Sequence, residues 1–191
     1  IDGGKGKSAE LPPITVRQDF PENWRIILLV NSREKGIHGQ KEYNAFKTLK
    51  PFPENLAEKL CRLVNMVILP SLIEKNFNDF SEAIGQLQKI VGTHFSPIQG
   101  GVYSNPDIAN IMNYAEQNGF MGVGQSSWGP TGFILTDSDT SAHKLTKDIK
   151  QNFLCKDLQI EIIKGRNKGS YIESFSNENV SQNKNLNTYK E

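Results

Sequence analysis

The stretch that decides the fold reads Met121-Gly122-Val123-Gly124-Gln125-Ser126-Ser127-Trp128-Gly129-Pro130-Thr131-Gly132-Phe133. Four glycines, three hydroxyl side chains and a proline lie here between two apolar, strand-like segments. Glycine allows positive φ and lets a ligand approach closely, while successive N–H groups and hydroxyls donate to phosphate oxygens. The composition therefore predicts an anion-binding loop, whose side-chain donors are Gln125, Ser126, Ser127 and Thr131. A tight hairpin without a ligand is the alternative interpretation.

The segments on both sides of this loop predict strands. Residues 120–123 lead into the loop and residues 132–136 lead out of it. Upstream, Trp24-Arg25-Ile26-Ile27-Leu28-Leu29-Val30 is a continuous apolar run of the kind that forms a buried strand. A last short strand is expected at residues 160–163, where three isoleucines gather.

Amphipathic helices are expected between these strands. Apolar residues recur at helical spacing over residues 56–68, 77–91 and 142–153, and a short helix is expected over residues 41–49. Pro70 is expected to end or kink the first of the long helices.

One further helix has clear start and stop signals. Asn105 and Pro106 predict its N-cap and first position, and Asn118-Gly119 predicts its end. Between it and the preceding helix, residues 95–103 are expected to form a second glycine-containing loop. The whole order predicts an α+β fold with a mainly antiparallel sheet and helices packed on one face.

Composition narrows the classes of partner. Because 22 basic residues face 21 acidic ones, no polycationic surface is expected, and nucleic acid is a poor default partner. No run of about 18 apolar residues predicts a membrane span, and no signal peptide is apparent. Cys61 and Cys155 lie far apart without zinc-ligand spacing, so we expect buried free thiols and a reducing, cytoplasmic setting.

The ends of the chain differ in composition from its middle. The chain starts at Ile1 without an initiator methionine and reads as part of a longer protein. Residues 1–13 are rich in Gly, Lys and Pro and are expected to be a linker, whereas residues 14–173 form the domain. Residues 174–191 are mostly Ser, Asn, Gln and Lys, and we expect a disordered tail there.

Two residues after the first strand are candidates for proton transfer. His38 lies between two glycines in a polar loop, and its ordinary pKa allows it to act near neutral pH. Glu42 follows on the short predicted helix. Simple solvation is the alternative interpretation for both side chains, which are the best catalytic candidates in the chain.

The central motif, Gly122 to Thr131, resembles the C-terminal glycine motif of the β-ribofuranosylaminobenzene 5′-phosphate synthase family, a branch of the GHMP kinase superfamily. Other segments agree with the family pattern in the same order: Ile1-Asp2-Gly3-Gly4, residues 11–17, Phe20-Pro21-Glu22-Asn23-Trp24-Arg25 and Gln99-Gly100-Gly101-Val102-Tyr103. The resemblance covers roughly residues 1 to 173. It implies a two-lobed enzyme of which this chain is the ferredoxin-like C-terminal lobe, with residues 1–13 ending a missing N-terminal lobe.

The resemblance also implies a reaction and its partners. The family condenses 4-amino- or 4-hydroxybenzoate with 5-phosphoribosyl 1-diphosphate and releases carbon dioxide and diphosphate, on the route to methanopterin-type cofactors. Mg²⁺ is the implied cofactor, with its ligands expected in the missing half. The chain's own N-terminal lobe and a second copy of the chain are the expected protein partners.

The site residues follow from this chemistry as hypotheses. We expect the phosphate or diphosphate pocket to be lined by Gly122, Gly124, Gln125, Ser126, Ser127, Gly129 and Thr131, with Gln99, Gly100 and Gly101 from the second loop. Arg17 and Arg25 are candidates to hold a phosphate or the substrate carboxylate, because a guanidinium fits both geometrically. Trp128 is expected to lie against the aromatic acid or the ribose, or to act as a packing anchor.

Two other classes of function stay open from the sequence. An ATP-dependent small-molecule kinase of the GHMP type uses the same fold and loop. The other open class is a binding or dimerisation lobe without catalytic turnover.

Overall fold

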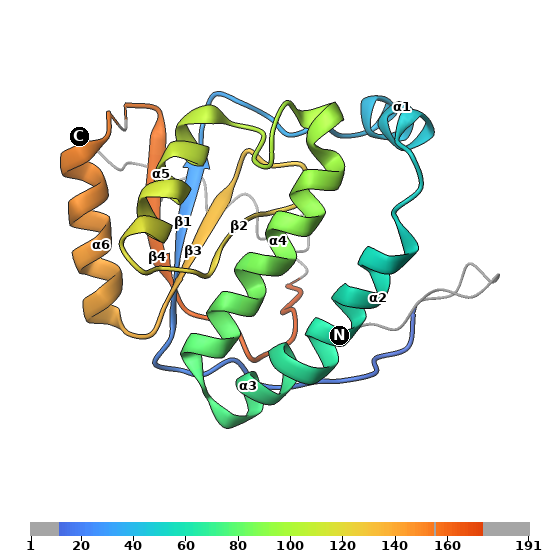
Figure 1. The fold of residues 1–191 in the computed structure, drawn as a ribbon. Helices are drawn as coiled ribbons and strands as arrows, with labels where there is room; N and C mark the ends of the chain where they lie inside the picture. The colour runs from blue at the N-terminus through green and yellow to red at the C-terminus, as the bar shows by residue number, and fades with distance from the viewer. Residues whose placement is uncertain (1–11, 155, 174–191) are drawn as a thin grey trace, which may run out of the picture.

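A four-stranded antiparallel sheet forms the centre of the molecule. The computed structural model describes residues 12–154 and 156–173, so nearly all of the predicted linker and the whole predicted tail lie outside the described residues. The strands are β1 (Arg25–Asn31), β2 (Val123–Gln125), β3 (Gly132–Thr136) and β4 (Leu158–Ile163), in the order β2-β3-β1-β4. With helices between β1 and β2 and between β3 and β4, this is the ferredoxin-like arrangement that was predicted (Figure 1).

The register of the strands separates the two faces of the sheet. On β1, Ile27 pairs with Ile134 of β3 and Ile162 of β4. Ile27 and Ile134 are fully buried, and they belong to one core cluster with α5 (Pro106–Gln117) and α6 (Asp139–Asn152). In Figure 1, α5 lies in front of the sheet and α6 stands at the left, beside β4. Alternation along each strand sends Ile26 and Leu135 to a second cluster.

The long helix α4 (Phe77–Gln99) runs along the free edge of β2. Gly85 makes this approach possible, because a Cβ atom at that position would lie 2.1 Å from the carbonyl oxygen of Met121. Further along α4, the Gln88 Oε1 atom accepts a hydrogen bond of 3.0 Å from the Gln125 backbone N–H. Helix α4 therefore covers the β2 edge and supplies it with a hydrogen-bond partner.

The second core cluster joins α4 to the preceding helices. Buried Trp24, Ile68, Phe80, Ala83 and Leu135 form its centre. The preceding helices are α2 (Glu54–Leu63), a π-helical segment η1 (Val64–Ile68) and α3 (Leu69–Glu74). Pro70 was expected to end or kink the helix, and it lies in the first turn of α3, directly after the wider π turn. Pro70 has no backbone N–H to donate to the preceding turn, yet the chain stays helical from α2 to α3.

Three local predictions are wrong. The strand expected over residues 120–123 lies at Val123–Gln125 instead. The loop expected over residues 95–103 is helical as far as Gln99, because α4 continues through Pro97 before Gly100 ends it with φ of 88°. Cys61 was expected to be buried, but it is an exposed free thiol on α2, a helix without fully buried residues. Cys155 lies outside the described residues.

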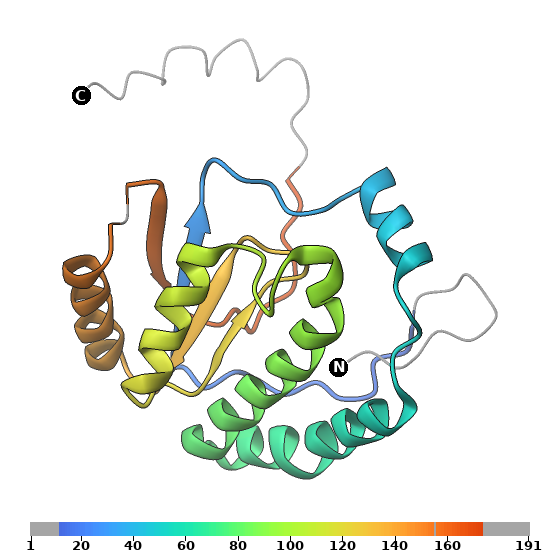
Figure 2. The same cartoon turned by 45° about the horizontal axis from the view of Figure 1, so that its top comes forward.

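Helix α1 (Gln40–Thr48) is attached differently from the others. It begins after Gly39, which has φ of 61° and no capping side chain, and its only buried residue is Ala45. Figure 2 shows this light-blue helix joined on both sides by extended segments. Its position therefore depends on a few side-chain contacts, which belong to the site described below.

An ion pair fixes the start of α6 to the start of β1. The Arg25 Nε atom donates to Asp139 Oδ1 at 2.8 Å, and the guanidinium also donates to the carbonyl oxygens of Glu22 and Trp24. The hydrogen bond from Arg25 lowers the pKa of the Asp139 carboxyl from its ordinary value of 3.8. Ser138 caps the same helix by accepting from the Ser141 backbone N–H.

This ion pair makes stability dependent on pH in one direction. Because the folded-state pKa of Asp139 lies below its ordinary value, its contribution is present above pH 3.8 and is lost as pH falls through the folded-state pKa. We expect Asp139→Asn to be less stable than the wild type at neutral pH and to approach it in strong acid. Urea unfolding at several pH values measures this, with Asp148→Asn on the same helix as control. A difference that is constant with pH would contradict it.

Candidate functional site

Three loops meet at the end of the sheet where β1 finishes. They are residues 32–39 after β1, residues 100–105 before α5, and residues 126–131 between β2 and β3. Gly36 lies against the third loop so closely that a Cβ atom there would be 2.0 Å from the Gly129 carbonyl oxygen. The Ser104 backbone N–H donates to Gln125 Oε1 at 2.7 Å. Asn105, which also caps α5 as predicted, donates to Glu34 Oε2 at 2.9 Å.

The loop of residues 126–131 is a hairpin turn, and two of its own backbone N–H groups donate hydrogen bonds within it. The Ser126 N–H donates to the Thr131 carbonyl, and the Gly129 N–H donates to the Ser126 carbonyl, both at 2.9 Å. Ser127 and Gly129 adopt positive φ, of 51° and 67°. The hairpin interpretation of this segment is thus correct for its backbone. Ser126 and Ser127 are exposed, so their hydroxyls are accessible to a ligand.

Gly122 and Gly124 lie in buried parts of the hairpin. A Cβ atom at Gly122 would lie 2.9 Å from Leu135 Cβ, and one at Gly124 would lie 2.4 Å from Phe133 Cζ. The structure therefore gives these two glycines a packing reason. Side chains of the sheet and of α4 pack directly against them. Their assignment to a phosphate pocket stays a prediction.

A cavity of about 230 Å³ lies beside the hairpin loop, between α4 and α1. Five residues singled out from the sequence line it: Glu42, Gln99, Gln125, Ser127 and Trp128. The sequence reasoning did not single out the remaining lining residues, which are Phe46, Gln88, Val91, Gly92, Phe95 and Val102. The cavity is thus partly polar, through glutamines, and partly aromatic.

Trp128 is the central wall of this cavity and the contact that holds α1. Its ring is buried and makes edge-on contacts with Phe95 and Phe46, with centroid distances of 4.9 and 5.6 Å. Its Nε1 atom donates to Glu42 Oε1 at 2.9 Å. Since Glu42 and Phe46 are one helical turn apart, a single face of α1 is bound to the loop. The predicted role of Trp128 as a packing anchor fits this geometry.

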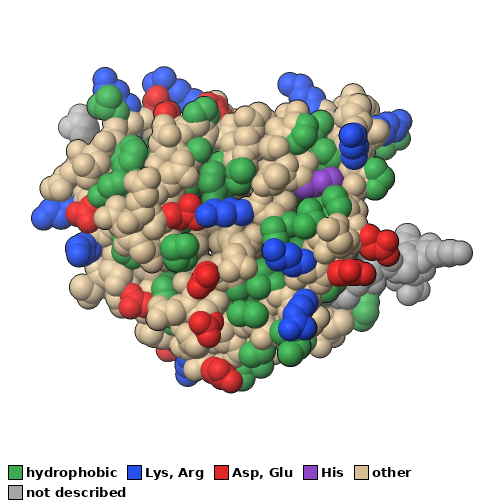
Figure 3. Space-filling view, viewed as in Figure 1, with side chains coloured by type: hydrophobic (Ala, Val, Ile, Leu, Met, Phe, Trp, Pro, Cys, Tyr) green, Lys and Arg blue, Asp and Glu red, His purple; other side chains and the backbone are tan. Residues whose placement is uncertain are grey.

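The aromatic wall continues into a neighbouring groove. Phe46 and Phe95 also line a second, more open hollow together with Leu49, Lys50, Pro51, Phe52 and His94. The His94 ring stands edge-on against Phe52 at 4.6 Å. Figure 3 shows hydrophobic side chains gathered over this part of the surface, between α4 and the connection from α1 to α2.

The glutamine side chains of the cavity form a fixed network. Gln125 Oε1 accepts from Ser104, while its Nε2 donates to Gln99 Oε1 at 3.2 Å and to the Ser127 carbonyl at 3.1 Å. Gln99 Nε2 in turn donates to the carbonyl oxygens of Gly101 and Val102. These amides hold the second loop against the hairpin, so both loops are positioned by side chains rather than by strand pairing.

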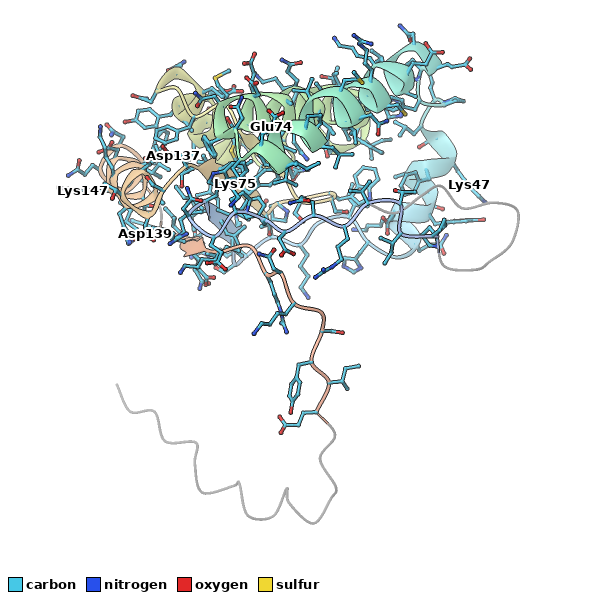
Figure 4. All side chains as sticks on the ribbon, turned by 90° about the horizontal axis from the view of Figure 1, so that it is seen from below. Lys47, Glu74, Lys75, Asp137, Asp139 and Lys147 are labelled. Atoms are coloured by element: carbon cyan, nitrogen blue, oxygen red, sulfur yellow. The ribbon has the colours of Figure 1, made fainter. Side chains whose placement is uncertain are left out.

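Other predicted residues do not line the cavity. Within residues 12–154 and 156–173, its lining does not include His38, Ser126, Gly129, Thr131, Gly100, Gly101, Arg17 or Arg25. Arg25 stands at the opposite end of β1 and is bonded to Asp139, and Figure 4 shows Asp139 and Lys47 of α1 on opposite sides of the molecule. Arg17 donates to the Asn167 carbonyl at 2.8 Å. Neither arginine therefore shares the cavity with the hairpin loop.

Tyr103, in the loop of residues 100–105, belongs to the core and not to the cavity. Burial and the nearby Glu116 carboxylate raise the pKa of its hydroxyl to about 12. Glu116 itself is paired with Lys89 of α4 at 2.6 Å. Tyr103 is therefore neutral at physiological pH and anchors the loop between α4 and α5.

No metal centre or membrane helix emerges from the described part of the chain. Across residues 12–154 and 156–173, no three His, Cys, Asp or Glu side chains are grouped so as to hold a metal ion. The expected Mg²⁺ thus does not find the carboxylate set it prefers in these residues alone. Of the described helices, none is long and apolar enough to cross a membrane.

Comparison with known proteins agrees with the fold and the motif. Residues 68–154 match the family model of the GHMP kinase C-terminal domain. The chain is 32% identical over 130 residues to the β-ribofuranosylphenol 5′-phosphate synthase of Methanothermobacter thermautotrophicus, covering 68% of this chain and 38% of the relative. The Methanocaldococcus jannaschii protein of the same name is 33% identical over 138 residues, or 72% of this chain and 39% of the relative.

Solved structures show the same fold at low sequence identity. Mevalonate pyrophosphate decarboxylase from Streptococcus pyogenes superimposes with a TM-score of 0.55 at 15% identity, over 81% of this chain and 48% of that one. Mevalonate kinase from L. major gives 0.53 at 12% identity, over 76% and 44%. The chain spans well under half the length of the two methanogen relatives above. The glycine motif, the family match and the relatives together place this chain in the β-ribofuranosylaminobenzene 5′-phosphate synthase family of the GHMP kinase superfamily, to whose C-terminal part it corresponds.

Proposed function

We propose that this chain is the C-terminal lobe of an enzyme that joins 4-hydroxy- or 4-aminobenzoate to the ribosyl 5-phosphate of 5-phosphoribosyl 1-diphosphate. The methanogen relatives carry a name that contains both a phenol and a phosphorylated sugar, which supports this reaction class. The main structural support for this proposal is the cavity beside Gln125, Ser127 and Trp128, because the most specific part of the motif forms its wall. The product leads towards methanopterin-type cofactors.

The reaction balances without an outside acid or base. A bond forms between the anomeric carbon and the ring carbon that carries the carboxylate. The bond from the anomeric carbon to diphosphate breaks, and its electron pair leaves with diphosphate. Carbon dioxide then departs, and the electron pair of its bond to the ring restores aromaticity. What the protein must supply is therefore orientation, electrostatic stabilisation and exclusion of water.

The test uses the full-length protein with carboxyl-labelled benzoates. Release of labelled carbon dioxide that depends on 5-phosphoribosyl 1-diphosphate is the expected result. Consumption of ATP without carbon dioxide release would instead identify a small-molecule kinase. Ligand binding without either turnover would identify a non-catalytic lobe, and both of these outcomes would overturn the proposal.

The exposed hydroxyls of the hairpin loop are expected to contact the phosphorylated donor. We expect Ser126→Ala combined with Ser127→Ala to weaken donor binding about thirtyfold, since each of the two lost hydrogen bonds contributes roughly 1 kcal/mol. Folding should be unaffected because both side chains are exposed. Calorimetric titration with 5-phosphoribosyl 1-diphosphate measures the effect, and an unchanged melting temperature is the control. Unchanged donor affinity would remove both residues from the site.

A further inference from the structure

We propose that the cavity beside the hairpin receives the aromatic ring of the acceptor and not the phosphate of the donor, and that Glu42 recognises the ring's hydroxyl or amino group. This inference rests on the proposed function for the identity of the acceptor. Its physical basis lies in the shape, the charge and the unused polar atoms of the cavity.

The shape and walls of the cavity suit a single aromatic ring. A dry protein cavity of roughly 150 Å³ holds one benzene molecule, and this one measures about 230 Å³, which leaves room for two ring substituents. Phe46, Phe95 and Trp128 already meet edge to face, with Phe46 and Phe95 centroids 6.2 Å apart. Edge-to-face contacts between aromatic rings contribute stabilising free energy beyond that of burying their apolar area. A ligand ring would extend an existing cluster.

The charge of the cavity is wrong for a phosphate. Among the described residues, its lining contains no lysine, arginine or histidine, and its only charged side chain is the Glu42 carboxylate. Phosphate groups in proteins are held by Arg, Lys and arrays of N–H donors. The nearby amides of Gln125, Ser126 and Gly129 are already bonded within the protein. A phosphate placed here would face a carboxylate without a compensating cation, which is unfavourable.

Three side-chain polar atoms of the cavity lining remain available for a ligand, and one of them is the accessible Ser127 hydroxyl. Glu42 uses Oε1 for Trp128, and within the described part of the chain its Oε2 atom accepts no hydrogen bond. Gln88 uses Oε1 for Gln125, and its Nε2 atom has no acceptor among the same residues. The cavity thus offers one strong acceptor, one neutral donor and a hydroxyl that can do either. A ring with an O–H or N–H at one position and an oxygen elsewhere matches the Glu42 acceptor and the Gln88 donor.

The Glu42 carboxylate also fits the chemistry of the proposed reaction. The ring carbon that attacks the sugar lies para to the hydroxyl or amino group, so electron density released by that group increases its nucleophilicity. A carboxylate that accepts the O–H hydrogen draws the proton and pushes electron density into the ring. Glu42 therefore both selects acceptors that can donate a hydrogen bond and activates them. No proton needs to leave the complex.

The experiment uses the full-length protein and Glu42→Gln. Glutamine keeps an oxygen for Trp128 Nε1 but removes the carboxylate, so the cavity wall is preserved. Calorimetry with 4-hydroxybenzoate and 4-methoxybenzoate measures recognition, because the methoxy group cannot donate a hydrogen bond. We expect the wild type to prefer 4-hydroxybenzoate, and Glu42→Gln to weaken its binding about tenfold to a hundredfold while barely changing 4-methoxybenzoate. The matched control is Glu58→Gln, an exposed residue of α2.

The outcomes separate this inference from the proposed function. If carbon dioxide release is absent but 4-hydroxybenzoate binds in a Glu42-dependent way, the cavity assignment holds and the reaction is wrong. If Glu42→Gln alters affinity for inorganic phosphate or 5-phosphoribosyl 1-diphosphate and leaves both benzoates unchanged, the cavity is a phosphate site and the inference falls. A second variant, Phe95→Leu, should weaken both benzoates alike. Unchanged binding in both variants would also overturn the assignment.

Discussion

Replacing Trp24 by alanine is expected to lower the free energy of unfolding by about 3 to 5 kcal/mol, as is typical for large aromatic side chains in a core. Trp24 is 2% exposed and contacts Phe20, Phe77 and Phe80 with ring centroids 5.0 to 5.4 Å away. It precedes β1 and joins that strand to α4. Removing its ring leaves a cavity between these two elements.

Chemical denaturation of Trp24→Ala and Trp24→Phe gives the measurement and its control. The phenylalanine variant keeps part of the aromatic contact and should lose much less stability. The cavity beside the hairpin lies at the other end of the sheet. It should still bind 4-hydroxybenzoate under conditions where the alanine variant is folded. A loss below about 1 kcal/mol for Trp24→Ala would show that the aromatic cluster relaxes into the space.

Gly85→Ala is expected to destabilise the protein by about 2 kcal/mol, although alanine favours helices. Two effects oppose each other here. Alanine in a helix interior gains roughly 1 kcal/mol over glycine. The new Cβ atom, however, would lie 2.1 Å from the Met121 carbonyl oxygen, so α4 and the β2 edge must move apart. Overpacking of this kind costs about 1 to 3 kcal/mol, and a backbone neighbour places it at the upper end.

The neighbouring exposed residue gives the matched control for this substitution. Gln86→Ala tests alanine on the same turn of α4 without a clash, and it should leave stability nearly unchanged. Thermal unfolding of both variants separates helix propensity from packing. A Gly85→Ala protein as stable as Gln86→Ala would mean that α4 does not depend on close approach to the strand.

The fold was predictable from the sequence where local signals and burial agree. The apolar run of residues 24–30 became β1, and Asn105-Pro106 started α5 at the expected position. The order of elements then led to the antiparallel sheet. The segment at Phe95 to Gln99 was mispredicted, because Pro97 and the following glycines are strong loop signals. Contacts of Phe95 with Trp128 help to keep this turn of α4 in place, and such tertiary packing is invisible to propensity.

The candidate site was only partly predictable, for a different reason. The motif identified Gln125, Ser127 and Trp128 because polar and aromatic residues in a glycine-rich loop are unusual. Gln88 and Phe46 lie on helices where a glutamine or an exposed aromatic residue carries no signal, yet they complete the cavity. The composition of the loop also suggested phosphate, whereas the cavity's charge comes from a glutamate on α1. That glutamate is 86 residues from Trp128 in the chain, so only the fold brings them together.

The course of α4 along β2 also determines how the sheet can be extended. With the β2 side shielded by a helix, the only strand edge left for pairing with further backbone, within the part of the chain that the structure describes, is that of β4. Any additional strand, from another part of the protein or from another molecule, must therefore add at Leu158–Ile163. Growth of the sheet is thus restricted to the side remote from the hairpin.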